Sequence, residues 1–264
     1  MIDATTLQTF SVARKGMKLC PCQSCIGGTC TNCSGGFNET GCPETENFEA
    51  ELMSIAAPTD ADANANANVG ADNDDVATHT LRLMWMTGDL VWPAFGNVTL
   101  RVYVDGESEA SLKFRVYEAQ ALAFGWDQEE QKTFGNRYMG KGSLFGGLYL
   151  AMPIPFSTSL RVTAELPEVD FKLGMSHGFY FIGRGLYNMP VFIDGNIRLP
   201  DTARLKVART AGTFAPHSVN PIHNSTSSGG MVFLVTLVVS SAINHFLEGE
   251  MSVVIDEQEP MLLS

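Results

Sequence analysis

The sequence predicts an all-β fold, a jelly-roll β-sandwich, over about residues 76–264. Short segments in which apolar and polar residues alternate recur along this part of the chain. Glycine, proline, asparagine and aspartate separate these segments, as they do between short strands. No segment has a sustained period of 3.6 residues with capping residues at both ends, which a long helix would show. This pattern is typical of sandwiches and jelly rolls.

A β-hairpin is predicted at residues 98–117. Apolar side chains occupy every second position of VTLRVYV, residues 98–104, and polar or aromatic side chains lie between them. The pair Asp105-Gly106 follows directly and is a strong signal for a tight turn. SLKFRVY, residues 111–117, then resumes the alternation, so the two segments are expected to pair.

Further strands are expected along the rest of this domain. Trp85 is in phase with Leu81 and Leu83, which predicts that its indole ring lies in the core. The other expected strands lie at residues 78–86, 157–165, 178–185, 202–209, 231–239 and 251–256.

The N-terminal residues 1–57 form a cysteine-rich segment that contains all six cysteines of the chain. Six cysteines can form three disulfides, as in a small secreted module, and this interpretation is favoured. The alternative is a tetrahedral zinc site, although its two CxxC pairs are closer together than is usual. The zinc ligands would be Cys22, Cys25, Cys30 and Cys33.

An acidic linker is predicted at residues 58–75, which consist mostly of aspartate, asparagine and alanine. The formal net charge of the chain is −12, and residues 1–75 carry most of it. This charge argues against a nucleic-acid partner and favours neutral or cationic ligands.

No membrane span is expected, because the longest apolar run, residues 231–242, is shorter than the about 20 residues that cross a bilayer. No signal peptide is visible at the start of the sequence. The cysteines and several N-x-S/T sequons favour a secreted location.

Three motifs occur in order along the chain: LRVYVDG at residues 100–106, MPIPF at 152–156 and EGEMSVVID at 248–256. Together with residues 178–205, they resemble glycoside hydrolase family 172, the former domain-of-unknown-function 2961 family. The resemblance implies a double jelly roll and assembly as a homotrimer. It also implies retaining hydrolysis of furanosides, such as α-fructofuranosyl or arabinofuranosyl linkages, with carbohydrate as the partner. No cofactor is expected.

In that family a G-T-E-D-Y-F-like motif and a second jelly roll follow the strand that is found here at residues 248–256. The resemblance therefore implies that this chain holds the N-terminal portion of a family domain, incomplete relative to the double jelly roll. The catalytic carboxylates would then lie elsewhere, and this fragment is expected to be inactive.

Glu248 and Glu250 are the candidate catalytic pair within the chain. On an extended strand their side chains share one face and lie about 6.5–7 Å apart. Glycosidases place their two carboxyl groups roughly 5–9.5 Å apart, so the spacing is suitable. A strand with one face in solvent shows the same alternation of polar and apolar residues, however, and this structural interpretation is favoured.

Substrate-binding residues are predicted in two loops and on this strand. Trp126 and Asp127 lie in a long glycine-rich segment, and His217 lies in a loop rich in proline, serine and asparagine. Aromatic, histidine and carboxylate side chains can stack on sugars or bind their hydroxyls. Glu248 is a further candidate for substrate contact. The alternative function is a non-catalytic extracellular protein that binds carbohydrate or is purely structural.

Overall fold

The computed structural model describes the chain in separate stretches, which are residues 9–19, 25–26, 29–30, 49–58, 78–88, 98–119, 134–135, 137–141, 147–165, 177–193, 196–200, 202–213, 215, 218–224, 230–232, 234–235, 251–254 and 261–263. The chain divides into two compact units, residues 1–227 and residues 228–264. The first unit contains two sheets that form a sandwich. In the second unit, β16 (Met251–Val253) pairs with β17 (Met261–Leu263) as a short antiparallel hairpin.

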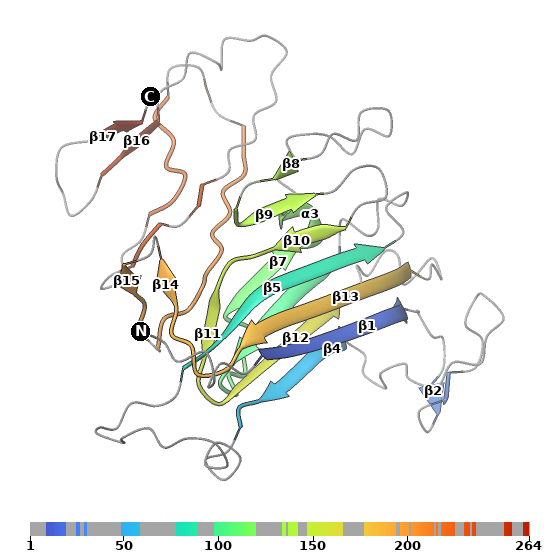
Figure 1. The fold of residues 1–264 in the computed structure, drawn as a ribbon. Coiled ribbons are helices and arrows are strands. Elements are labelled where there is room, and N and C mark those ends of the chain that lie inside the picture. The colour runs from blue at the N-terminus through green and yellow to red at the C-terminus, as the bar shows by residue number, and fades with distance from the viewer. Residues whose placement is uncertain are drawn as a thin grey trace, which may run out of the picture. The chain divides into compact units, whose positions relative to one another are not determined.

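The first sheet contains seven strands among the described residues, in the order β1-β13-β5-β10-β9-β8, with β11 also paired to β5 (Figure 1). All of these pairs are antiparallel. The strands are β1 (Thr9–Leu19), β5 (His79–Gly88), β8 (Phe134–Gly135), β9 (Met139–Lys141), β10 (Leu148–Leu150), β11 (Ile154–Phe156) and β13 (His177–Leu186).

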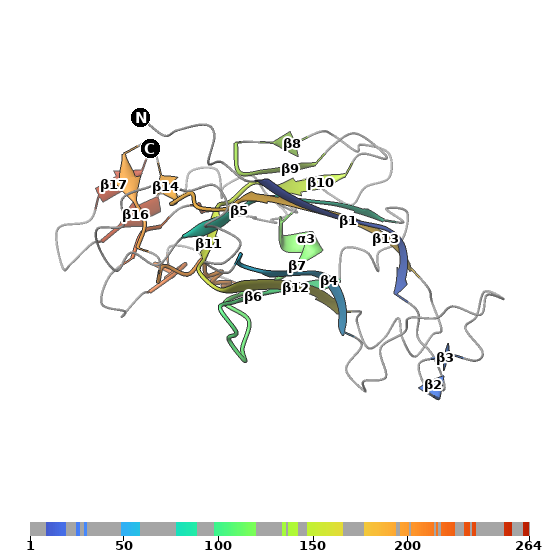
Figure 2. The ribbon, with the colours of Figure 1, turned by 60° about the horizontal axis from the view of Figure 1, so that its bottom comes forward.

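The second sheet contains four strands in the order β4-β12-β6-β7, again antiparallel. Figure 2 shows the two sheets as layers, with the one-turn helix α3 (Val116–Ala119) between them. The strands of this sheet are β4 (Glu49–Ala56), β6 (Thr99–Val104), β7 (Leu112–Arg115) and β12 (Ser159–Glu165). Two short strands outside both sheets, β14 (Phe192–Ile193) and β15 (Ile197–Arg198), form a separate pair.

The hydrophobic core lies between the two sheets. Alternation on β6 is as predicted, because Leu100, Val102 and Val104 are fully buried. Leu112 and Phe114 on β7 are buried as well, and the predicted hairpin of β6 and β7 is confirmed. The core side chains of the first sheet include Leu81, Met84, Met86, Leu148, Leu150 and Phe181.

The chain passes from the first sheet to the second between β11 and β12. These strands are separated by only Ser157 and Thr158, yet β11 pairs with β5 and β12 pairs with β4 and β6. The backbone must turn sharply at such a corner, which leaves amide groups without partners in either sheet.

Two strands of the sandwich come from residues that precede the predicted acidic linker. β1 pairs with β13, and β4 pairs with β12. The sheets therefore take strands from both sides of residues 58–75, and the predicted division of the chain stays a prediction.

The prediction that Trp85 lies in the core is wrong. The register between β5 and β13 shifts at Arg82, since Leu81 pairs with Gly185 while Leu83 pairs with Arg184. Such an irregularity changes the phase of the side chains. Beyond it, Met84 and Met86 point into the core, and Trp85 points to the outer face, where it is half-buried.

The predicted strand at residues 202–209 is also absent. These residues are described, and they have no regular secondary structure. Alternation specifies which side chains would share a face, but a strand also requires a neighbour with which to pair, and none of the described strands pairs with this segment. Val116 and Tyr117, expected at the end of a strand, instead begin α3.

The all-β sandwich is confirmed, and the jelly-roll topology stays a prediction. In the described part of the chain, no helix has the length and apolar character needed to cross a membrane.

Candidate functional site

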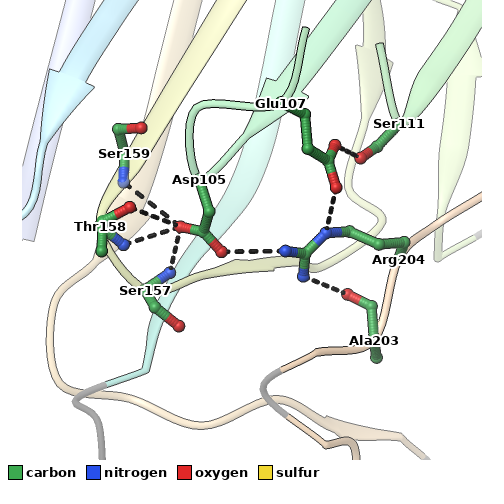
Figure 3. Close-up of polar contacts among 8 residues, drawn as sticks. All are labelled: Asp105, Glu107, Ser111, Ser157, Thr158, Ser159, Ala203 and Arg204. Carbon is green, nitrogen blue, oxygen red and sulfur yellow. Dashed lines mark hydrogen bonds and ion pairs between the residues drawn. The ribbon is translucent and has the colours of Figure 1, made fainter. Parts of the chain in front are cut away.

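The turn that ends β6 is the centre of a polar cluster at one end of the sandwich (Figure 3). Asp105 and Gly106 both have left-handed backbone conformations, with φ of 54° and 75°. The Glu107 amide donates to the Val104 carbonyl at 3.1 Å, which closes a tight turn. Aspartate and glycine tolerate positive φ better than other residues, so the turn predicted from Asp105-Gly106 is confirmed.

Asp105 caps the corner between β11 and β12. Its Oδ1 atom accepts hydrogen bonds from the amides of Ser157 (2.8 Å), Thr158 (2.7 Å) and Ser159 (3.3 Å). The Thr158 hydroxyl donates to the same oxygen at 3.2 Å, and the Asp105 amide donates to the Ser159 carbonyl at 2.8 Å. One carboxylate thus satisfies the amides that the change of sheet leaves without strand partners.

Arg204 joins the two carboxylates of this turn. Its Nη2 lies 3.0 Å from Asp105 Oδ2, and its Nε lies 2.8 Å from Glu107 Oε1. The other terminal nitrogen, Nη1, donates to the Ala203 carbonyl at 3.1 Å. The Ser111 hydroxyl donates to the second oxygen of Glu107. We call Asp105, Glu107, Ser111 and Arg204 the turn cluster.

Both carboxyl groups of the turn cluster favour the ionised state. Burial acts to raise the pKa of Asp105, but the three backbone amides and the Arg204 charge outweigh it, and the pKa is lowered. Burial also acts to raise the pKa of Glu107. Hydrogen bonds from Ser111 and Arg204 and the charge of Arg204 outweigh this effect, so that pKa is lowered too.

His79 lies beside this cluster at the start of β5, where it is only 2% exposed. Its Nδ1 accepts a hydrogen bond from the Asn188 amide at 3.0 Å, which places the proton of the neutral ring on Nε2. The ring centroid lies 5.2 Å from that of Phe156 and 5.3 Å from that of Tyr187. Burial lowers the pKa of His79, against the opposing effects of the Asp105 charge and a hydrogen bond to the Ser157 backbone.

The turn cluster is suited to holding the chain together. A glycosidase needs one carboxylic acid with a raised pKa and one free carboxylate that attacks carbon or activates water. Asp105 and Glu107 both have lowered pKa values, and both are bound to Arg204. Neither can protonate a leaving group near neutral pH. Among the described residues, no group of three or more histidine, cysteine, aspartate or glutamate side chains can hold a metal ion.

The sequence predicts candidate residues for catalysis, substrate binding and metal binding. Most of them lie outside the described residues, namely Trp126, Asp127, His217, Glu248, Glu250, Cys22 and Cys33. Their roles stay predictions. Cys25 and Cys30 lie on the short strands β2 (Cys25–Ile26) and β3 (Thr29–Cys30), where the register places them opposite each other. This position is compatible with both the disulfide and the zinc interpretation.

Sequence reasoning identified the Asp105-Gly106 turn but missed its partners. Arg204 lies 99 residues from Asp105 in the chain, in a segment predicted to be a strand. His79 was present at the start of an expected strand, with no pattern to single it out. A signal did exist in the motifs, since residues 100–106, residues 152–156 and the end of residues 178–205 all lie at or next to the turn cluster.

No protein of curated function matches the sequence. Residues 73–191 match the protein-family model described as GH172 first beta-sandwich domain. These residues include β5, β6, β7, β11, β12 and β13, and therefore the central strands of both sheets. The resemblance to glycoside hydrolase family 172, and to the N-terminal portion of its domain, is thereby confirmed over residues 73–191.

Proposed function

We propose that the protein acts on furanosides, as a retaining glycoside hydrolase of the α-fructofuranosidase or arabinofuranosidase type. The observation that carries this proposal is the match of residues 73–191 to the first β-sandwich domain of family 172. The relation to glycoside hydrolases is what that match supports directly. The furanoside substrate and the retaining mechanism are extensions of it.

Within this function, the described sandwich serves as a framework and does not supply the catalytic pair. The support for this role is the turn cluster, whose two carboxylates are ionised and bound to one guanidinium. A general acid must hold a proton at the working pH, and a nucleophile must be accessible to the sugar carbon. The chain by itself is therefore expected to bind furanosides and to hydrolyse them negligibly.

A direct assay tests both parts of the proposal. The purified chain is incubated with an aryl α-L-arabinofuranoside and with an α-fructofuranosyl disaccharide, and sugar release and binding heat are measured separately. Binding of a furanoside without release is the expected result. A folded chain that neither binds nor hydrolyses any furanoside would contradict the furanoside proposal.

The same assay examines Glu248 and Glu250, the candidate pair of the sequence. If the chain hydrolyses a furanoside and either Glu248→Gln or Glu250→Gln abolishes that activity, the inactive-framework proposal is wrong and the pair is catalytic. If hydrolysis is lost instead in Asp105→Asn while the fold remains intact, the turn cluster has a direct role in the chemistry. Either result would be decisive, because glutamine and asparagine keep the shape and remove the ionisable group.

A second candidate function is a non-catalytic sandwich that binds carbohydrate or is purely structural. The carboxylates of the turn cluster favour it, since both are ionised and bound to Arg204. Carbohydrate binding without hydrolysis, even when partner chains are supplied, would separate this function from the first. Assembly as a homotrimer belongs to the first proposal, and native mass spectrometry measures it.

A further inference from the structure

Two aromatic side chains lie next to each other on the outer face of the first sheet. Met84 and Met86 point into the core, so Trp85 between them points outward. Leu148 and Leu150 are buried in the same way, which places Tyr149 on the outer face. Trp85 and Tyr149 are direct partners in the register of β5 and β10. Directly paired residues on one face have their Cβ atoms about 4.5–5.5 Å apart.

Both rings extend across glycines of the adjacent backbone segments in the sheet. A Cβ atom built on Gly140, the partner of Tyr149 on β9, would collide with the phenol end of the Tyr149 ring. A Cβ atom on Gly147 would collide with the Trp85 indole. Each ring therefore occupies the space of a missing side chain and lies along the sheet. Both side chains are only half-buried, so part of each ring remains open to solvent.

The surroundings of the two rings combine apolar and polar groups. On β13, Ile182 is the direct partner of Trp85 and extends the apolar surface. Tyr180, 40% exposed, is two residues from it, and Arg184, also exposed, is two residues away on the other side. An aromatic centre with hydroxyl and guanidinium groups at its rim is typical of a site that binds a ligand with both apolar faces and hydroxyls.

Charge and size decide what this surface can bind. The chain carries a net charge of −12, which disfavours anionic ligands. The row from Ile182 through Trp85 to Tyr149 crosses three strands, or about 10 Å at the usual strand spacing, which corresponds to about one or two sugar rings.

We propose that this surface, with Trp85 and Tyr149 as its stacking rings, is a binding site for a neutral saccharide chain. The C–H face of a sugar ring would stack on the exposed part of the rings, and hydroxyls would bind the polar rim. That the saccharide is a furanoside rests on the proposed function. The binding surface itself rests on the arrangement of β5, β9, β10 and β13.

Native affinity electrophoresis of the full chain tests the proposal. The gels contain soluble arabinan, inulin or, as a pyranoside polymer, xylan, and the variants are Trp85→Ala, Trp85→Leu, Tyr149→Ala and Tyr149→Phe. Retardation by at least one polymer is expected to weaken about tenfold or more in Trp85→Ala, Trp85→Leu and Tyr149→Ala. Tyr149→Phe keeps the ring and should retain most of the binding. Ile197→Ala, which alters a side chain 53% exposed on β15, is the control and should bind as the unmodified chain does.

The outcomes separate this site from the proposed function. Retardation by xylan alone, lost in the ring variants, would support the stacking surface and contradict the furanoside proposal. Retardation by arabinan or inulin that persists in all four variants would support furanoside binding and overturn the stacking surface. A folded chain that no polymer retards would overturn it as well. Trp85→Leu keeps the outer face apolar, so its circular dichroism spectrum and melting temperature check that lost binding does not reflect lost folding.

Discussion

The sulfur atom of Met53 occupies the space that a side chain at Gly183 would need. A Cβ atom built on Gly183 would lie 2.5 Å from Met53 Sδ and 3.3 Å from Phe181 Cε1. Met53 belongs to β4 of the second sheet, whereas Gly183 and Phe181 belong to β13 of the first. Met53 and Phe181 are fully buried. The two sheets are therefore in direct contact at this point, and the glycine permits it.

Gly183→Ala is predicted to lower the free energy of unfolding by about 1–3 kcal/mol, because the added methyl group overpacks the contact with Met53. Chemical denaturation measures the change. In the double variant with Met53→Ala, the cost of the added methyl group should be smaller, since the shorter side chain leaves room for it. Gly106→Ala is the control: its backbone φ is +75° but nothing lies within 4 Å, so its cost should not depend on Met53. Equal costs of Gly183→Ala with and without Met53 would show that packing is not the cause.

Arg204→Met should destabilise the sandwich by about 1–3 kcal/mol, because it leaves Asp105 and Glu107 as two adjacent negative charges without their shared cation. Arg209→Met is the matched control. Arg209 also pairs with a carboxylate, Glu118, at 3.3 Å, but its side chain is 59% exposed. An exposed ion pair contributes about 0–1 kcal/mol, so this variant should remain near the unmodified protein in thermal unfolding. Similar losses for both variants would mean that the turn cluster has no special importance.

Asp105→Ala should be more damaging than Asp105→Asn. Alanine removes the acceptor of three amides and disfavours the positive φ of 54°, whereas asparagine keeps an acceptor oxygen and tolerates that conformation. Asp105→Asn loses mainly the charge that Arg204 binds. Because the pKa of Asp105 is lowered in the folded state, its ionised form stabilises the fold above about pH 4, and that contribution is lost on further acidification. Unfolding curves recorded from neutral to acidic pH should therefore converge for the asparagine variant and the unmodified protein at low pH.

His79 should make the stability of the sandwich depend on pH in a higher range. Burial lowers its pKa in the folded state, so the unfolded chain takes up the proton first as the pH falls. The contribution of the neutral ring is complete above about pH 6.5 and declines as the pH falls below that value. The asparagine in His79→Asn supplies an oxygen that can accept the hydrogen bond from the Asn188 amide, and its side chain does not titrate. Its melting temperature should vary less between about pH 7 and pH 5, and an unchanged pH profile would assign the dependence to other groups.

The state of the cysteines can be decided by the mass of the intact chain. Three disulfides would lower the mass by six hydrogen atoms, as expected if the six cysteines form the favoured framework. The zinc alternative predicts one equivalent of metal by elemental analysis and free thiols after chelation. Cys25→Ser and Cys30→Ser should have the same effect in either case if these opposed residues act together.

Local patterns were sufficient for much of the fold. Alternation predicted the buried faces of β6 and β7, and the Asp105-Gly106 pair predicted the turn that follows β6. These features depend on neighbours in the sequence, so they can be read from it directly. The prediction for Trp85 failed because the irregularity at Arg82 arises from the pairing of β5 with β13. No residue pattern within β5 indicates it.

The sequence by itself determined the class of fold, the main hairpin and the family resemblance over residues 73–191. Only the tertiary structure decided that β1 and β4 join the sheets, that Arg204 binds Asp105 and Glu107, and that Trp85 and Tyr149 share an outer face. The physical reason is that alternation and turn residues specify which side of a strand is buried. They do not specify which distant segment will satisfy its backbone groups, its charges or the space beside a glycine, since those partners are chosen when the sheets assemble.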